Sequence, residues 1–246
     1  MHRTHNSAKV GSIPSSPIII LSIMIKDKTI VLCLPGKTFS GNFMISLIEL
    51  LSFISSEGGT FKISQQYSSM VNFARCKCAG ADVSNGKNQL PFNGLHYDYM
   101  MWIDSDIAFN VEMFKKLIEV DKDIASGWYA QPGDSGTGFY TPVVEEMDNE
   151  YFEENGSYKF LTTKDLLERE QIFKVDYTGF GWILIKQGVF ESIEYPWFAP
   201  KIINIGDELQ DVCSEDVSFC KDVKDAGFDI WLDPTCRVGH EKTLVI

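Results

Sequence analysis

Short apolar runs alternate with amphipathic stretches through the first half of the chain, and this alternation limits the fold more than any other feature. Residues 29–34 form a continuous apolar, β-branched run closed by Pro35-Gly36, as expected of a strand buried on both faces. The order of strand and helix patterns predicts an α/β fold with an open, mainly parallel sheet flanked by helices. Further strands are predicted at 61–64, 97–103 and 123–126, with helices at 41–56, at 68–79 and after Asn110.

The helix predicted at 41–56 carries its apolar residues on one face, which we expect to cover the sheet before Gly58-Gly59 end the helix. The residues of this face are Phe43, Met44, Leu47, Ile48, Leu51 and Ile54.

The second half of the chain has a different pattern and predicts a smaller, mixed unit. Residues 131–170 are acidic and rich in turn formers, and Asn155-Gly156 predicts a hairpin. Ser214 is placed to cap a helix that runs to about Ala226, with Gly227 stopping it. Strands are expected at 173–177, 182–186 and 230–232.

The charge balance excludes several classes of partner. The 246 residues include 22 basic and 34 acidic side chains, which gives a net charge of −12 and a pI near 4.8. Such a surface repels phosphate backbones and anionic lipid, so neither nucleic acid nor a membrane surface is an expected partner. An acidic protein can nevertheless hold an anionic ligand through a metal ion.

Residues 1–26 are interpreted as a leader that is poorly ordered or adds a strand. Their apolar run at 17–25 is far shorter than the about 20 residues that a membrane span needs, and no small-residue cleavage site follows it. We therefore expect a soluble, cytoplasmic protein without a membrane span. The 6 cysteines form no C-x-x-C pair, which favours buried free thiols in a reducing compartment.

Two carboxylates one residue apart, Asp104 and Asp106, follow the apolar run 100–103. In open parallel sheets, ligands bind just beyond the carboxyl ends of the strands, where this pair is expected to lie. Mg²⁺ and Mn²⁺ are held by one or two carboxylates, with phosphate oxygens and water completing the shell. The pair is therefore suited to a metal–diphosphate, although an acidic strand-to-helix turn would have the same pattern.

Three further features could complete such a site. Glu215 and Asp216 stand at the N-terminus of a predicted helix, where they either complement the helix dipole or act on an acceptor hydroxyl. His240 follows the last predicted strand and is either a third ligand for Mn²⁺ or a structural residue. The segment 178–182 combines glycines with Trp182, which suits either stacking against a sugar or a bend between strands.

The loop Pro35-Gly36-Lys37-Thr38 is not a P-loop. The Walker pattern requires a glycine five residues before Gly36, and position 31 is valine. The loop could still contact a nucleotide through its backbone at the end of a strand.

The order of the motifs along the chain narrows the choice of protein class. They are Leu-Pro-Gly at 34–36, Asn-Phe-Ala-Arg at 72–75, Trp-Ile-Asp-Ser-Asp at 102–106, Thr-Gly-Phe-Gly-Trp at 178–182, Ser-Glu-Asp at 214–216 and Val-Gly-His-Glu-Lys at 238–242. Together they resemble the GT-A nucleotide-sugar glycosyltransferases over residues 28–242. Within that superfamily the chain looks most similar to fungal Golgi mannosyl- and galactosyltransferases, which are retaining enzymes, and to soluble glycosyltransferases of large algal viruses.

The resemblance implies roles for individual residues. Asp106 and His240 would bind Mn²⁺ or Mg²⁺, and Asp104 would meet the ribose or share the metal. Glu215 or Asp216 would be the catalytic carboxylate that faces the acceptor hydroxyl or the transferring sugar. The residues implied to contact the donor are Pro35, Gly36, Lys37, Arg75, Asp104, Ser105, Gly181, Trp182 and Lys242.

The resemblance also implies an organisation and a reaction. Residues 27–130 would be the nucleotide-sugar-binding half of one GT-A (Rossmann-like) domain, and residues 131–246 its acceptor-binding half. The expected reaction moves a hexose from a nucleoside-diphosphate sugar to a glycan or glycoprotein hydroxyl with retention. GDP-mannose is the preferred donor, ahead of UDP-hexose or UDP-xylose, and a homodimer is compatible with this scheme. Two alternatives stay open: a nucleotidyltransferase that makes a sugar nucleotide, and a non-catalytic nucleotide-sugar-binding module.

Overall fold

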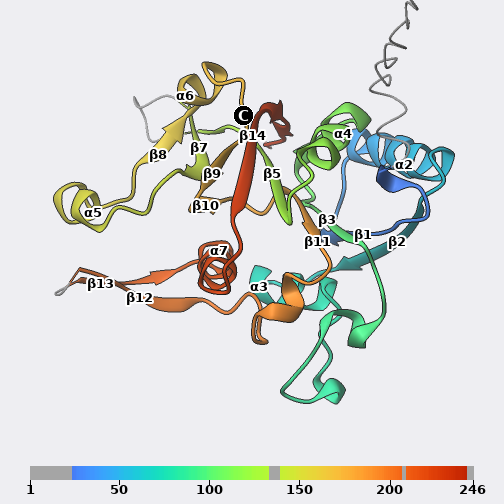
Figure 1. Ribbon diagram of the computed structural model, residues 1–246, viewed down its shortest axis with the longest axis horizontal. Helices are drawn as coiled ribbons and strands as arrows, with labels where there is room; N and C mark the ends of the chain where they lie inside the picture. The colour runs from blue at the N-terminus through green and yellow to red at the C-terminus, as the bar shows by residue number, and fades with distance from the viewer. Residues whose placement is uncertain (1–23, 133–138, 207–208, 243–246) are drawn as a thin grey trace, which may run out of the picture.

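The computed structural model describes residues 24–132, 139–206 and 209–242, and its centre is a seven-stranded sheet in the order β2-β1-β3-β11-β5-β14-β9 (Figure 1). Strands β2, β1 and β3 run parallel, as do β5 and β14, whereas β11 and β9 run antiparallel to their neighbours. This arrangement confirms the open, mainly parallel sheet. The strands are β1 (Thr29–Pro35), β2 (Thr60–Gln66), β3 (Tyr99–Ile103), β5 (Ile124–Trp128), β9 (Phe173–Val175), β11 (Trp182–Lys186) and β14 (Ile230–Arg237).

Helices cover both faces of this sheet, as predicted. Helices α2 (Gly41–Ser56) and α4 (Val111–Val120) pack on one face, in a hydrophobic cluster that includes Met101. Helices α3 (Val71–Cys78) and α7 (Glu215–Asp225) lie on the other face, where Trp102 is buried (Figure 1). Successive residues of a strand enter opposite layers because side chains alternate across a sheet.

Local signals fix the ends of the helices. The Ser40 hydroxyl accepts a hydrogen bond from Phe43 N at 3.1 Å and begins α2. The Asn110 side chain accepts one from Met113 N at 3.1 Å and begins α4, as its sequence predicts. Gly227 follows α7 with a φ of +92°, a left-handed conformation that favours glycine after a helix.

The buried face of α2 differs in part from the prediction. Its buried residues are Phe43, Leu47, Leu50 and Ile54. Met44 and Ile48 were expected on this face but are 43% and 59% exposed. Phe53 contacts Phe114 of α4 on the opposite flank of α2, so Met44 and Ile48 face away from α4 toward the sheet edge at β2. No further strand of the described residues extends the sheet there to cover them.

The second half adds a smaller antiparallel sheet in the order β10-β7-β6, with β8 paired to β7. Asn155-Gly156, predicted to turn a hairpin, instead ends a helix. Asp148 caps the start of that helix, and Gly156 takes a left-handed φ of +72° at its end, a conformation that Asn-Gly supports in either setting. The elements of this region are β6 (Gln131–Pro132), β7 (Phe139–Val144), α5 (Asn149–Asn155), β8 (Phe160–Thr162), α6 (Thr163–Leu167) and β10 (Tyr177–Thr178).

Two short strand pairs were not predicted. Strands β12 (Lys201–Ile205) and β13 (Leu209–Cys213) form an antiparallel pair that extends away from the main sheet (Figure 1). Strands β4 (Ile107–Ala108) and β15 (Gly239–His240) are also antiparallel and join the turn after β3 to the end of the described chain. The 3-10 helices are η1 (Val83–Asn85), η2 (Pro91–Gly94) and η3 (Phe190–Ser192).

The structure can be compared with three predictions made from composition, which concern the leader, the cysteines and a membrane span. The leader prediction falls mostly on residues 1–23, which lie outside the described residues, although Ile25 is fully buried in the cluster beneath α2. All 6 cysteines are buried and free, as predicted. Among the described residues, no helix combines the length and apolar character needed to cross a membrane.

Candidate active site

The candidate site lies where β1 and β3 end, on the loops that follow them. A Cβ built on Gly36 would lie only 2.5 Å from the Cβ of Ser105, so the loop after β1 packs directly on the acidic turn after β3. Glycine at position 36 permits this approach because it has no side chain. The structure therefore brings together the predicted donor-binding residues Pro35, Gly36 and Ser105 at the carboxyl ends of these two strands.

Asp106 is the centre of a first polar group, which we call the Asp106 group. Its Oδ2 lies 2.9 Å from His240 Nε2 and 2.9 Å from Lys242 Nζ. The pairing of β15 with β4 makes this contact, because it places His240 opposite Ile107. Partial burial alone raises the pKa of Asp106, but hydrogen bonds from His240 and Lys242 outweigh it and lower the pKa to about 2.

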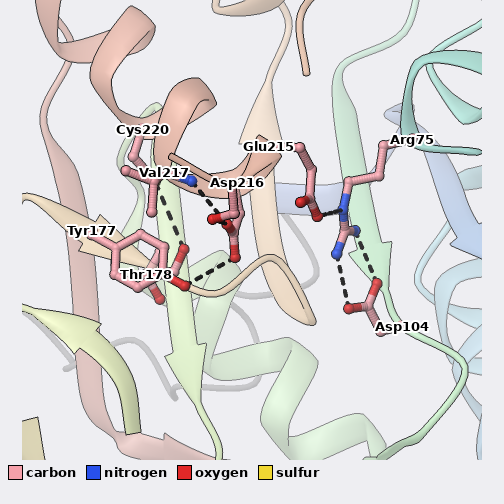
Figure 2. A network of polar contacts seen from close by, with 9 residues as sticks. Arg75, Asp104, Tyr177, Thr178, Glu215, Asp216, Val217 and Cys220 are labelled. Atoms are coloured by element: carbon pink, nitrogen blue, oxygen red, sulfur yellow. Dashed lines mark hydrogen bonds and ion pairs between the residues drawn. The ribbon is translucent and has the colours of Figure 1, made fainter. Parts of the chain in front are cut away.

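Arg75 is the centre of a second polar group, the Arg75 group, which Figure 2 shows. Its two terminal nitrogens donate to the two oxygens of Asp104 at 2.9 and 3.0 Å, and its Nε donates to Glu215 Oε1 at 3.2 Å. The Arg75 side chain is only 4% exposed. Burial alone would lower the pKa of Arg75, but the charges and hydrogen bonds of Asp104 and the charge of Glu215 outweigh it and raise the pKa above its ordinary value.

Glu215 and Asp216 begin α7 but point to opposite sides (Figure 2). Glu215 turns to Arg75, whereas Asp216 accepts hydrogen bonds from the Tyr177 hydroxyl at 2.9 Å and from Val217 N at 2.9 Å. The Ser214 hydroxyl also donates to Asp216. Asp216 is thus held by its own helix start and by β10, and of the two acids only Glu215 joins the group at the strand ends.

The backbone of the segment Gly179–Gly181 lies against the acidic turn after β3. Asp104 N donates to Gly181 O at 3.1 Å, and a Cβ on Gly179 would lie 2.4 Å from the Tyr129 hydroxyl. Trp182, in contrast, is fully buried and packs on Phe109 with ring centroids 5.0 Å apart. Of the two interpretations of this segment, the burial of Trp182 favours a bend between strands over stacking on the donor, because β11 lies inside the sheet and turns this side chain into the core.

The structure also changes the position expected for Arg75. Its guanidinium was expected to contact the nucleoside, but it is buried and directed at Asp104 and Glu215. Lys37 is exposed at the end of β1, with its Nζ 5.7 Å from the centre of the Tyr67 ring. Of the predicted nucleoside contacts, Lys37 is therefore exposed and Gly36 partly exposed, whereas Pro35 and Arg75 are buried.

The predicted set of three metal ligands is not assembled. The described residues contain no group of three or more His, Cys, Asp or Glu side chains that could hold a metal ion. Asp104 is engaged by Arg75 through both oxygens, while Asp106 and His240 lie side by side. The three carboxylates of the two groups face two cations and one histidine, which leaves a formal charge of −1 when the histidine is neutral.

The Asp106–His240 pair nevertheless suits a divalent cation. His240 Nδ1 lies 3.3 Å from the backbone oxygen of Ala130, which can only accept a hydrogen bond. The tautomer that is protonated on Nε2 donates to Asp106, whereas the tautomer that donates from Nδ1 to Ala130 leaves the Nε2 lone pair free to bind a cation beside the Asp106 carboxylate. A cation held by Asp106 and His240 would take the second tautomer, and a histidine ligand whose other nitrogen donates to a carbonyl is the usual arrangement at metal sites.

Two tyrosines of the site were not found from the sequence. Tyr129 packs edge-on against His240 with ring centroids 4.9 Å apart, and Tyr177 donates to Asp216. The glycines at 179 and 181 were the available signal, because a Cβ at either position would overlap Tyr129. Nothing local to Tyr177 indicates a partner 39 residues away.

A separate cavity of about 560 Å³ lies among β7, β8, α5 and α6, and no predicted site residue lines it. It is lined by Glu145, Glu146, Asp148, Tyr151, Lys159, Leu161, Asp165, Glu168 and Arg169.

Comparison with known proteins supports the fold and goes no further. No protein-family model matches the chain, and no curated protein matches it. A solved structure of GalNAc-T7 with UDP, GalNAc and Mn²⁺ is 14% identical over 88% of this chain and 44% of that chain, with a TM-score of 0.50. The chain thus spans less than half of that glycosyltransferase. This likeness shows a GT-A-like fold and not a particular family.

Two further solved structures align at lower scores. A197 from STIV is 14% identical over 89% of this chain and 96% of that chain, with a TM-score of 0.45. An inositol-1-phosphate CTP transferase from T. maritima is 9% identical over 89% of this chain and 90% of that chain, with a TM-score of 0.40.

Proposed function

We propose that this protein is a metal-dependent glycosyltransferase. It would move a hexose from a nucleoside-diphosphate sugar, with GDP-mannose as the first donor to test, to a glycan or glycoprotein hydroxyl with retention. The observation that carries the proposal is the Asp106–His240 pair at 2.9 Å, because a carboxylate and an imidazole side by side can both serve as ligands of Mn²⁺ or Mg²⁺. The GT-A-like fold supports it, because Asp106 follows the parallel strand β3 at its carboxyl end, where such folds bind their ligands.

The residues of the Asp106 group would serve the donor. Asp106 and His240 would hold the cation, and Lys242 would turn from Asp106 toward the diphosphate. When bound, the metal supplies Lewis-acid stabilisation of the charge that develops on the leaving diphosphate. Pro35, Gly36 and Lys37 would flank the nucleoside, since their loop packs on the acidic turn at Ser105.

Glu215 is the stronger candidate for the catalytic carboxylate. It lies in the Arg75 group with Asp104, whereas the oxygens of Asp216 accept from Tyr177, Val217 and Ser214. Glu215 would orient the acceptor hydroxyl or stabilise the transferring sugar, and Asp216 would hold the start of α7 in place.

The test is a donor panel with product analysis. The protein is incubated with GDP-mannose, UDP-hexoses and UDP-xylose, with Mn²⁺ or with a chelator, and release of nucleoside diphosphate is measured. We expect release with one donor class only when metal is present. The anomeric configuration of a transferred sugar, read by NMR, tests retention.

A matched pair of histidine variants locates the activity. His240→Ala should abolish the metal-dependent release, while His96→Ala, at a histidine that is 71% exposed, should leave it unchanged. Pyrophosphate release from a nucleoside triphosphate and a sugar phosphate would instead favour a nucleotidyltransferase. Tight binding of a sugar nucleotide without any turnover would favour a binding module.

A further inference from the structure

We propose that Arg75 is a positioning residue that holds the catalytic carboxylate of Glu215 in place from the donor-binding half of the molecule. This role rests on the proposed function. Arg75 lies on α3, Asp104 follows β3 and Glu215 begins α7, so one side chain joins three elements that are distant in the sequence (Figure 2).

The geometry of the guanidinium is fully determined by its neighbours. One edge makes the paired contacts to Asp104, and Nε reaches Glu215 Oε1. The guanidinium carbon lies 5.1 Å from the centre of the Phe180 ring, which supports the flat face of the group. A planar fork with an adjacent Nε–H is specific to arginine, and the single ammonium group of lysine cannot reproduce it.

Arg75 contacts Asp104 and Glu215 in different ways. Both oxygens of Asp104 accept from Arg75, whereas Glu215 is held through Oε1 alone. Asp104 therefore anchors the arginine, and Glu215 keeps its second oxygen for a ligand. Arg75 itself is 4% exposed and directs three nitrogens at these acids, so it acts through Glu215 rather than by touching the donor.

Charge explains why the orientation of Glu215 depends on Arg75. Asp104 and Glu215 are two carboxylates held in one small region, and they would repel each other without the cation between them. The Arg75 charge also persists at any working pH, since burial, which lowers its pKa, is outweighed by the charges of Asp104 and Glu215, which raise it. Without Arg75, Glu215 would turn toward solvent while the Asp106 group stays as it is.

The experiment compares Arg75→Lys with a matched variant, Arg169→Lys. Arg169 makes the same kind of paired contact, to Glu145 at 3.1 and 2.6 Å, and it also lies over an aromatic ring, Phe173. Its side chain is 33% exposed, and it belongs to neither polar group. Both variants keep the positive charge and lose the fork.

We expect Arg75→Lys to lower kcat by about 10- to 100-fold, as loss of a supporting contact does, while the KM for the donor stays within about threefold. Mn²⁺ binding, measured by calorimetry, should be unchanged, because the Asp106 group is intact. Arg169→Lys should match the wild type in kcat. Added guanidinium ion should restore part of the kcat of Arg75→Ala and none of that of Glu215→Gln.

The double variant Arg75→Lys/Glu215→Gln decides whether Arg75 acts through Glu215. We expect its kcat to equal that of Glu215→Gln alone. An Arg75→Lys kcat equal to wild type, a raised donor KM with unchanged kcat, or additive losses in the double variant would each overturn the positioning role. A wild-type protein that turns over no donor would overturn the proposed function itself.

Discussion

Asp104 and Asp106 are one residue apart and both follow β3, yet they belong to different networks. The chain turns immediately after the strand, with Ile107 N donating to Asp104 O at 3.1 Å, and this turn sends the two carboxylates apart. Asp104 points to the buried Arg75 and is 25% exposed, whereas Asp106 points to His240 and Lys242 and is 41% exposed. A D-x-D motif thus need not hold one metal with both acids.

Because their surroundings differ, we expect Asp104 to contribute mainly to stability and Asp106 mainly to ligand binding. An acid paired with a buried arginine supports the fold, because its removal leaves a desolvated charge. An acid paired with an exposed lysine contributes little to stability, since water screens the pair. Variants at the two positions should therefore fail in different measurements, and this contrast can be tested directly.

Asp106→Asn should have the largest effect on function. Loss of this carboxylate removes one of the two proposed cation ligands, and we expect metal-dependent turnover to fall by about 1,000-fold. The melting temperature measured with a chelator should stay close to that of the wild type. The control is Asp121→Asn, another acid paired with a lysine at the surface, which should keep full activity. Full activity in Asp106→Asn would contradict the metal assignment.

Asp104→Asn should have the largest effect on stability. It leaves Arg75 with Glu215 alone, and we expect the free energy of unfolding in urea to fall by roughly 3 kcal/mol. Asp106→Asn, measured in the same way with a chelator, should lose less than about 1 kcal/mol. Equal losses of unfolding free energy in the two variants would show that the Arg75 group and the Asp106 group contribute equally to stability.

Asp216→Asn should have a smaller effect that is confined to stability. Its oxygens serve the start of α7 and Tyr177, so we expect a loss of about 1 kcal/mol in the free energy of unfolding, as for a helix cap. Turnover should stay within about twofold of the wild type. A drop in kcat as large as that of Glu215→Gln would make Asp216 the catalytic acid instead.

Much of the fold can be predicted from the sequence because the signals for its strands and helix ends are local. Buried strands such as β1, the capping side chains Ser40 and Asn110, and Gly227 after α7 each act within a few residues. Asn155-Gly156 was misread because the same pair suits a hairpin and a helix end. Asp148, seven residues upstream, settles the choice by capping a helix.

The site is harder to predict because its contacts are long-range. The resemblance named Asp106 and His240, but their distance depends on the two-residue pairing of β4 with β15, which has no periodicity to detect. The resemblance assigned Arg75 to the nucleoside, and nothing near Arg75 in the sequence indicates Glu215, 140 residues away. Local pattern could not decide between stacking and a bend at Trp182, whose burial follows from the position of β11 inside the sheet.

The smallest expected effect is the pH dependence of the Asp106 contribution in metal-free protein. An aspartate in the unfolded chain has a pKa of about 3.9, and that of Asp106 is lowered to about 2 in the folded protein. Its stabilisation is therefore present above about pH 4 and is lost as the pH falls toward 2. We expect the wild type to exceed Asp106→Asn in unfolding free energy by less than about 1 kcal/mol at pH 6, because Asp106 is 41% exposed and water screens its contacts. Urea unfolding at pH 6, 4 and 3 should show that difference shrinking at the lowest pH. A constant difference would mean that His240 and Lys242 do not hold Asp106 in its charged form.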